Sequence, residues 1–344
     1  MRDPFLGATV GGRYRVDSLI GEGGLCAVYR AEDVREKRRV AVKVLPAARA
    51  AAPELAGRFR REVTTGKRIE HSNVVAISDS GELEDGSLYL VMELLEGRSL
   101  AALLAGGRVT LARALAIARQ MLVGLAEAHR LGIAHRDVKP ENVILVDVGG
   151  VETVKLLDFG IASNDRAAVK LTAAGVAFGT PEYISPEMAM GLPADARADL
   201  YAVGVVLFQM VTGRLPFTSK DPAALLRAHA QEPAPSPREV TPDGAIPPEL
   251  DALILRALQK LPEDRYASAN DMIAALDQLP RVKRGGFGRA IFVLIALALV
   301  AAAVWWWWNL RQNGGQSETQ SGAQSEPQSP APKPAKKRPT LPRR

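Results

Sequence analysis

The feature that most constrains this chain is a pair of polar motifs that lie close together in the sequence. The segment H-R-D-V-K-P-E-N occupies residues 135–142, and D-F-G follows at residues 158–160. Between them, a short stretch containing Gly149 and Gly150 predicts two strands joined by a turn. A lone H-R-D or D-F-G is typical of any ordinary turn. The occurrence of both motifs in this order is much less expected by chance than either motif alone, and it indicates a functional site.

The residues before and after Gly97 have different patterns. Short β-branched runs predict a small sheet in the N-terminal part, interrupted by a helix over residues 53–70. Beyond Gly97, segments rich in Ala and Leu at helical spacing predict a larger helical part. The expected strands are 14–21, 27–32, 39–45, 74–80 and 88–92, and the expected later helices are 111–130, 200–211, 250–259 and 269–279, with a surface loop at 232–248. The predicted fold class is therefore α+β, with a small β-rich lobe that contains one helix and a larger, mainly α lobe.

Charge and cysteine content exclude some classes of function. The net charge is +6, but residues 281–344 carry 11 basic and 2 acidic side chains, which leaves a net charge of −3 for residues 1–280. A slightly acidic main domain argues against a nucleic-acid-binding protein, which would show a basic stripe of its own. The single cysteine, Cys26, excludes an intrachain disulfide and favours a reducing compartment.

The two polar motifs closely resemble those of the protein kinase family. The resemblance implies a two-lobed protein kinase fold and an ATP-dependent phosphotransferase. In that family pattern, Asp137 orients the acceptor hydroxyl and accepts its proton, while Lys139 approaches the γ-phosphate. Asn142 and Asp158 would hold Mg²⁺, or Mn²⁺ in its place, because amide and carboxylate oxygens suit a hard cation. ATP and a divalent metal ion are thus the implied cofactors.

The N-terminal part resembles the nucleotide-binding region of the same family. V-A-V-K at residues 40–43 places Lys43 on a strand, and Glu62 follows nineteen residues later on the predicted helix, where the family forms an ion pair that holds the α and β phosphates. The glycine-rich turn at residues 21–28 departs from the family pattern, because Cys26 stands at its third glycine. We expect the thiol to lie near the phosphates and to face solvent. The ATP-binding residues that the resemblance implies are Ile20, Gly21, Gly23, Val28, Ala41, Lys43, Glu62, Met92, Glu93 and Leu95.

Y-L-V-M-E-L-L at residues 89–95 resembles the family's connection between lobes. Met92 would guard the adenine pocket, and the backbone of Glu93 and Leu95 would be available to adenine. A plain buried strand is the alternative interpretation of this run.

G-T-P-E-Y-I-S-P-E at residues 179–187 resembles the end of a kinase activation segment. By this resemblance Glu187 would pair with Arg265, and Asp199 would anchor the backbone of the catalytic loop. Thr172 is the expected phosphorylation site of the activation segment, where an added phosphate would interact with Arg136.

The C-terminal region predicts attachment to a membrane. Residues 290–308 form a run of 19 apolar residues, and a helix of that length spans about 28 Å, close to the thickness of the bilayer core. A buried core helix is the alternative, but the polar tail that follows offers nothing to pack against and is expected to be disordered. Basic residues on the N-terminal side of the run predict a cytoplasmic kinase domain with the short tail outside the cell. The predicted organisation is an N-terminal lead (1–13), a kinase domain (14–279, with lobes at about 14–93 and 97–279), a basic juxtamembrane segment (280–289), a transmembrane helix (290–308) and a tail (309–344).

The resemblance is closest to serine/threonine kinases, in particular to the bacterial branch of eukaryote-like kinases. It implies transfer of the ATP γ-phosphate to Ser or Thr of protein substrates and to the chain itself, in signal transduction at the membrane. The expected partners are protein substrates, a membrane and a second copy of the chain for trans-autophosphorylation, but no nucleic acid. A membrane-anchored pseudokinase scaffold is the main alternative, against which the intact Lys43, Asp137, Asn142 and Asp158 argue. A kinase of small molecules is a further alternative, disfavoured by the resemblance to a protein-docking activation segment.

Overall fold

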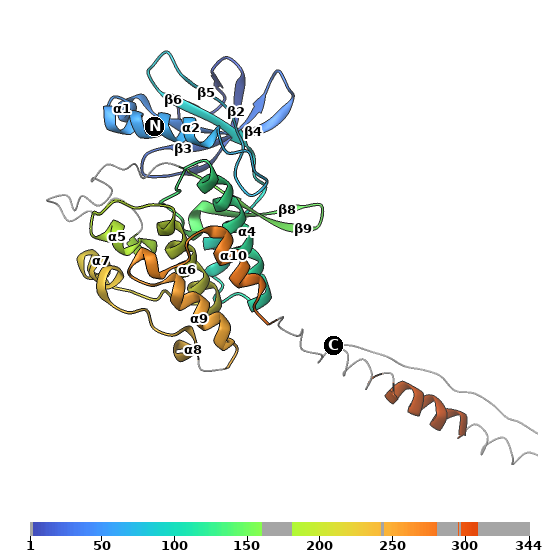
Figure 1. Cartoon of the computed structure of the whole chain (residues 1–344). Coiled ribbons are helices and arrows are strands. Elements are labelled where there is room, and N and C mark those ends of the chain that lie inside the picture. Colours follow the sequence, from blue (N-terminus) through green and yellow to red (C-terminus); the bar gives the residue numbers. More distant parts are fainter. Residues whose placement is uncertain (1–2, 160–180, 242–243, 281–294, 296, 309–344) are drawn as a thin grey trace, which may run out of the picture. The chain divides into compact units, whose positions relative to one another are not determined.

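The computed structural model describes residues 3–159, 181–241, 244–280, 295 and 297–308. The chain forms two separate units, Met1–Val282 and Lys283–Arg344. In the first unit a small β-rich lobe is followed by a larger helical lobe. Figure 1 shows the β-rich lobe at the top and the helical lobe beneath it. The predicted two-lobed α+β architecture is confirmed.

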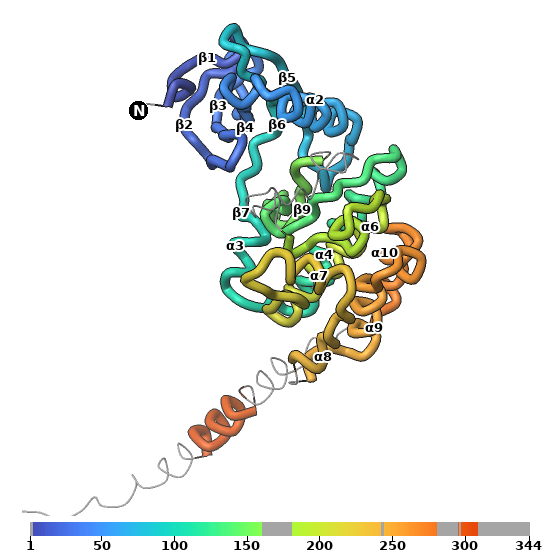
Figure 2. Tube along the Cα trace, turned by 90° about the vertical axis from the view of Figure 1, so that its left-hand side faces the viewer, coloured from blue at the N-terminus to red at the C-terminus, as the bar shows by residue number. Residues whose placement is uncertain are grey.

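The small lobe is a six-stranded antiparallel sheet with a long helix beside it, as Figures 1 and 2 show. The strand order is β1-β2-β3-β4-β6-β5. Its elements are β1 (Thr9–Val10), β2 (Tyr14–Glu22), β3 (Ala27–Asp33), β4 (Arg38–Leu45), α1 (Ala47–Ala50), α2 (Pro53–Gly66), β5 (Ile77–Glu82) and β6 (Leu88–Glu93).

Strand β4 is buried on both faces from Val40 onward, which explains its nearly continuous apolar run. Val40, Val42 and Val44 belong to a cluster with the aromatic side chains of β2, β3 and β6. Leu45 instead packs in a second cluster with Phe59 of α2. The helix is thereby held against the sheet, and the side chains on its sheet-facing side are fixed relative to β4.

Helix α2 begins with Pro53 at its first turn, where the missing N–H costs nothing, and ends at Gly66. The predicted end at residue 70 is wrong. The chain leaves the helix so that Ile69 packs in the core of the large lobe instead. The following strand also begins later than predicted, because Val75 bonds to Leu156 of the large lobe before β5 starts at Ile77.

The large lobe is built around a central buried helix, α6 (Arg197–Thr212). The core cluster of this lobe includes buried side chains of three other helices, α4 (Leu111–Arg130), α9 (Pro248–Ala257) and α10 (Ala269–Asp277). Helix α6 ends at Thr212, and the Gly213 that follows has a φ of 74°, a left-handed conformation that glycine adopts readily. The helices and strands of this lobe are β7 (Gly97–Ser99), α3 (Leu100–Leu104), α4 (Leu111–Arg130), β8 (Val143–Val148), β9 (Val151–Leu156), α5 (Pro186–Ala189), α6 (Arg197–Thr212), α7 (Pro222–Gln231), α8 (Pro237–Val240), α9 (Pro248–Ala257) and α10 (Ala269–Asp277), with 3₁₀ turns η1 (Pro140–Asn142), η2 (Pro181–Tyr183) and η3 (Pro262–Asp264).

Several elements of the fold, among them β1, β7, α7 and α8, differ from the sequence prediction. Strands β1 and β7 were not predicted, because each has only two or three residues and no pattern can be read over that length. The stretch predicted as a surface loop contains the short helix α8, which Ser236 caps by accepting a hydrogen bond from the backbone N–H of Arg238. The predicted pair of strands around Gly149 and Gly150 is confirmed as β8 and β9.

In the second unit, residues 297–308 are helical and exposed. Within the part of the chain that the structure describes, no helix is both long and apolar enough to cross a membrane. Residues 290–294 and 296 of the predicted transmembrane helix lie outside the described residues.

Candidate active site

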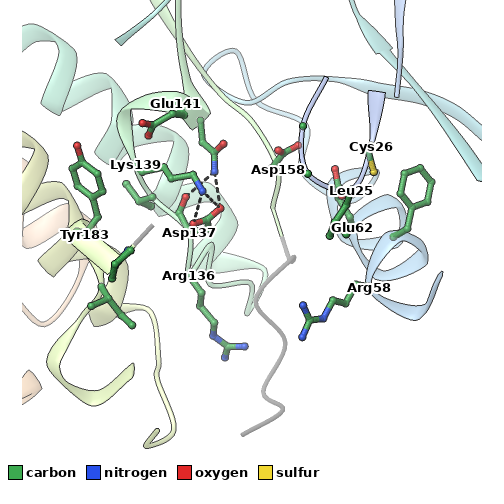
Figure 3. Close-up of a pocket in the computed structure, with 18 of the residues that line it drawn as sticks. Leu25, Cys26, Arg58, Glu62, Arg136, Asp137, Lys139, Glu141, Asp158 and Tyr183 are labelled. Carbon is green, nitrogen blue, oxygen red and sulfur yellow. Dashed lines mark hydrogen bonds and ion pairs between the residues drawn. The ribbon is translucent and has the colours of Figure 1, made fainter. Parts of the chain in front are cut away.

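A cavity of about 920 Å³ brings together the glycine-rich turn, α2 and the polar segment around Asp137 (Figure 3). Nine of the residues predicted for the site line it: Gly21, Gly23, Val28, Lys43, Glu62, Asp137, Lys139, Asn142 and Asp158. In Figure 3, Asp137 and Lys139 lie across the cavity from Cys26 and Glu62. Predicted residues as far apart in the sequence as Gly21 and Asp158 therefore share one cavity.

The remaining residues predicted for the adenine side lie outside the lining of this cavity. Ile20 is exposed on β2. Ala41 is buried on β4 directly opposite Met92 of β6, and Met92 lines a separate, very small cavity behind α2. Glu93 ends β6, and Leu95 follows it as a half-buried residue in the connection to β7.

Lys43 is held between two carboxylates. Its Nζ lies 2.7 Å from Oε1 of Glu62 and 2.8 Å from Oδ1 of Asp158. Strand β4 supplies the lysine and α2 the glutamate, which confirms the ion pair expected from the resemblance to protein kinases. The contact with Asp158 was not predicted, and it joins the small lobe to the large one at the cavity.

The charges of these three groups depend on one another. Burial acts against the charged form of Lys43, but the two carboxylates outweigh it and raise the pKa of the ammonium above its ordinary value. Burial likewise opposes ionisation of Asp158, yet the ammonium of Lys43 holds the pKa of that carboxyl below its usual range. Burial, with the nearby charge of Asp158, raises the pKa of Glu62. The ammonium and the Asp158 carboxylate are thus both charged at neutral pH.

The segment around Asp137 forms a second group of interacting side chains. The Nζ of Lys139 donates to Oδ1 of Asp137 at 3.0 Å, and Nδ2 of Asn142 donates to Oδ2 of Asp137 at 3.0 Å. These two donors fix the orientation of the carboxylate, which remains partly exposed to the cavity. The arrangement places an oriented carboxylate beside a cation, as proton acceptance and charge neutralisation require.

Asp199 of α6 anchors the backbone of the segment that precedes Asp137, as predicted. Its carboxylate accepts hydrogen bonds from the backbone N–H of His135 at 2.8 Å and of Arg136 at 2.7 Å. It also lies 2.8 Å from Nε2 of His129, a contact that the sequence did not indicate. The Asp199 side chain is 0% exposed, so these fixed neighbours take the place of water as hydrogen-bond partners of its oxygens.

Two residues of the site have a backbone conformation that L-residues rarely adopt. The φ angles of Arg136 and Asp158 are 60° and 58°. Such a conformation costs about 1–3 kcal/mol and persists only where the surroundings impose it. The Asp199 carboxylate imposes it at Arg136, and the ion pair with Lys43 holds Asp158. The strain thus lies at the residues that aim the two polar groups into the cavity.

The residues predicted to hold a divalent cation fit one only in part. The Asn142 amide nitrogen is engaged by Asp137, which leaves the amide oxygen to act as a ligand beside the Asp158 carboxylate. No cluster of three or more His, Cys, Asp or Glu side chains among the described residues could hold a metal by itself. Magnesium is commonly bound by one or two protein oxygens together with substrate phosphates. Asn142 and Asp158 fit that mode, with nucleotide phosphates as the remaining ligands.

Cys26 does not face solvent as expected. Its side chain is half-buried and packs with Leu25 against the apolar cluster of α2 and β4, although it lines the cavity. Burial raises the pKa of the Cys26 thiol to about 11. The thiol is therefore protonated at neutral pH and a poor nucleophile. The predicted place of Cys26 in the lining of the cavity is confirmed, but its predicted exposure to solvent is wrong, because its side chain makes an apolar contact with α2.

The predicted pair of Glu187 and Arg265 forms, and neither residue lines the cavity. Nη1 and Nη2 of Arg265 donate to the two carboxylate oxygens of Glu187 at 2.9 and 2.7 Å. Three backbone carbonyls accept the other bonds of the guanidinium, from Gln259, Lys260 and Arg197. The pair ties α5 to the segment before α10 inside the large lobe.

Some residues of the cavity were not predicted. Arg58, Glu141 and Tyr183 line it and are labelled in Figure 3. Arg58 precedes Glu62 by one helical turn, so the i,i+4 spacing on α2 was a signal that could have found it. Thr172, the predicted phosphorylation site, lies outside the described residues.

Comparison with known proteins identifies the family of this domain. A model described as "Protein kinase domain" matches residues 14–275. Pkn3 of Myxococcus xanthus, named a serine/threonine-protein kinase, is 41% identical over 82% of this chain and 52% of its own length. PknL of Mycobacterium bovis, with the same kind of name, is 41% identical over 81% of this chain and 68% of its own length. The chain spans only about 38–52% of the length of five curated relatives that it matches, Pkn3 among them.

Solved structures agree with this assignment. The kinase domain of Mycobacterium tuberculosis PknI superposes with a TM-score of 0.62 at 29% sequence identity, covering 79% of this chain and 98% of that one. The motifs, the geometry around Lys43 and Asp137, and the match over residues 14–275 agree with one another. The chain belongs to the protein kinase family.

Proposed function

We propose that the chain is a serine/threonine protein kinase that transfers the γ-phosphate of ATP to Ser or Thr of protein substrates and to itself. The observation that carries this proposal is the meeting of two polar groups in one cavity: Lys43 with Glu62 and Asp158, and Asp137 with Lys139 and Asn142. The first group can bind the anionic end of a nucleotide, and the second can activate an acceptor. The relatives named serine/threonine-protein kinases support the choice of acceptor.

The residues of the cavity divide the proposed reaction between them. The ammonium of Lys43, kept charged by its two carboxylates, binds the α and β phosphates. Asp137, oriented by Lys139 and Asn142, accepts the proton of the acceptor hydroxyl as its oxygen attacks phosphorus. Lys139 offsets the negative charge of the transferred phosphoryl group. A divalent metal ion at Asn142 and Asp158 would supply further charge neutralisation.

The proposal is tested by phosphate transfer from labelled ATP to a generic basic protein and to the chain itself. We expect transfer by the natural chain, and at least about a hundredfold less by Lys43→Met, because the phosphates lose the buried cation that would neutralise them. Binding of nucleotide without any transfer would instead identify a pseudokinase. Transfer by Lys43→Met at the natural rate would show that Lys43 is not required to bind the phosphates.

The phosphorylation site that we propose for self-activation is Thr172. Its support is the sequence between Gly160 and Pro181, in which Ser163 and Thr180 are the other hydroxyls and lie beside the motifs at either end. A phosphate on this segment can add one to three charge-assisted hydrogen bonds. Mass spectrometry of the autophosphorylated chain checks it. Thr172→Ala should remove the main phosphopeptide and lower activity several-fold, whereas phosphate confined to the C-terminal tail would contradict it.

Anchoring in a membrane, with the kinase domain in the cytoplasm, also belongs to the proposed function. Its support is the uninterrupted apolar run at residues 290–308, with basic residues before it, and the need of the site for cytoplasmic ATP. Cell fractionation checks it: the full chain should sediment with membranes, and a chain ending at Leu279 should not. A full chain found in the soluble fraction would contradict the anchor.

A further inference from the structure

The side chain of Glu93 joins three segments at the connection between the lobes. Its Oε1 accepts a hydrogen bond from the backbone N–H of Ala76 at 2.8 Å and lies 2.7 Å from Nζ of Lys155. The backbone N–H of Glu93 also donates to the carbonyl of Ala76 at 3.0 Å. Ala76 lies just before β5, Glu93 ends β6, and Lys155 belongs to β9 of the large lobe. We name Ala76, Glu93 and Lys155 the hinge clasp.

The segment before β5 is itself fixed to the large lobe. The backbone N–H of Val75 donates to the carbonyl of Leu156, and the N–H of Leu156 donates to the carbonyl of Asn73, both at 2.9 Å. The buried side chain of Asn73 donates to the carbonyl of Val154 at 2.9 Å. A small-lobe connection thus runs alongside β9 as an added piece of strand.

Gly124 of α4 permits this close approach. A Cβ at this position would lie 3.1 Å from the carbonyl oxygen of Asn73 and 3.0 Å from a methyl carbon of Leu156. Both distances are tighter than ordinary van der Waals contact. The large lobe therefore accommodates the segment ahead of β5 by close packing, and Ala76 is a fixed point to which Glu93 can be tied.

The ion pair of the hinge clasp differs from the ion pairs on the surface of the molecule. The side chains of Lys155 and Glu93 are 14% and 30% exposed, whereas those of the surface pair Arg60 and Glu82 are 60% and 57% exposed. Water and salt screen the hinge pair less. It also links two lobes, while Arg60 and Glu82 both belong to the small lobe.

We propose that Lys155 and the side chain of Glu93 are positioning residues for the nucleotide. By the resemblance to protein kinases, the backbone after β6 would contact adenine. The hinge clasp sets its place relative to β9 and to Asp158, which lies two residues beyond the end of β9. The clasp therefore holds the adenine contact and the phosphate contact in one fixed relation. This inference rests on the proposed function. Loss of the clasp should weaken nucleotide binding more than it slows phosphate transfer.

The test uses Lys155→Met in the full chain, because methionine retains most of the buried stem of lysine and removes the charge. We expect the KM for ATP, and the Kd for a non-hydrolysable ATP analogue, to rise about fivefold, with kcat changed less than about twofold. Lys155→Arg should restore most of the affinity. The matched control is Arg60→Met, which removes one member of the exposed pair and should leave both constants unchanged. A thermal melt confirms that each variant is folded.

A double-mutant cycle shows whether the pair itself is responsible. Glu93→Gln should weaken analogue binding to a similar extent, and the combination with Lys155→Met should be little worse than either single change. Unchanged analogue binding in folded Lys155→Met would overturn the proposal. A rise in kcat at unchanged KM would also overturn it, because the hinge clasp would then slow turnover without contributing to nucleotide binding. Binding of the analogue requires no phosphate transfer. If the natural chain binds nucleotide but transfers no phosphate, the proposed function is contradicted, and the binding measurements still test the hinge clasp. A natural chain that binds no nucleotide would overturn both.

Discussion

Replacing Asp137 by asparagine is expected to lower kcat about 10³-fold while leaving the Kd for nucleotide close to that of the natural chain. The asparagine side chain has the same shape, but its amide cannot accept the proton of the acceptor hydroxyl. Lys139 and Asn142, which both donate to the carboxylate of Asp137, would also lose a charged partner. The nucleotide-binding group around Lys43 has its own carboxylates and is not disturbed.

The measurement is phosphate transfer from labelled ATP, together with direct binding of a nucleotide analogue. Asp17→Asn, at an exposed position of β2, is the matched control and should transfer at the natural rate. Transfer by Asp137→Asn within about tenfold of the natural rate would show that proton acceptance by this carboxylate is not required.

Glu187→Gln is expected to lower the free energy of unfolding by about 3–5 kcal/mol, the largest effect on stability that we predict. The side chain of Arg265 is 0% exposed and that of Glu187 is 7% exposed. Neutralising Glu187 leaves the guanidinium charged, because arginine does not lose its proton in a protein, and water cannot reach it. Backbone carbonyls accept some of its hydrogen bonds but supply no negative charge.

Urea unfolding of each variant provides the measurement. Asp277→Asn is the control, since the Arg119–Asp277 pair has side chains 50% and 51% exposed and should contribute only about 0–1 kcal/mol. Replacing both Glu187 and Arg265 by methionine should recover part of the loss, because no unpaired charge then remains buried but three backbone carbonyls lose their donor. A loss below about 1 kcal/mol in Glu187→Gln would mean that the backbone carbonyls alone stabilise Arg265.

The elements that carry the site could be predicted because their patterns are local. β-branched runs with turns between them predicted β2, β3, β4 and β6, and helical spacing predicted α4 and α6. The polar motifs have specific residue types at short spacing, so Asp137, Lys139 and Asn142 were identified from one segment. The pair of Lys43 and Glu62 was expected from the resemblance to protein kinases, and its two residues belong to a strand and a helix that are neighbours in the chain.

Other features depend on how the two lobes pack, and no local pattern encodes them. Lys43 meets Asp158 across 115 positions of the sequence, and Lys155 meets Glu93 across 62. Helix α2 ends at Gly66, earlier than predicted, because the chain beyond it packs on the large lobe. The half-buried thiol of Cys26 likewise depends on its contact with the α2 cluster.

The sequence by itself determined the residue types of the site and the strands and helices that carry them, because hydrophobic periodicity and motif spacing act over a few residues. Only the tertiary structure decided their orientation. The left-handed backbone of Arg136 and Asp158 is imposed by a carboxylate of α6 and an ammonium of β4. A strained conformation is stable only when distant groups compensate for its cost, so the information lies in the packing of the lobes and not in the local sequence.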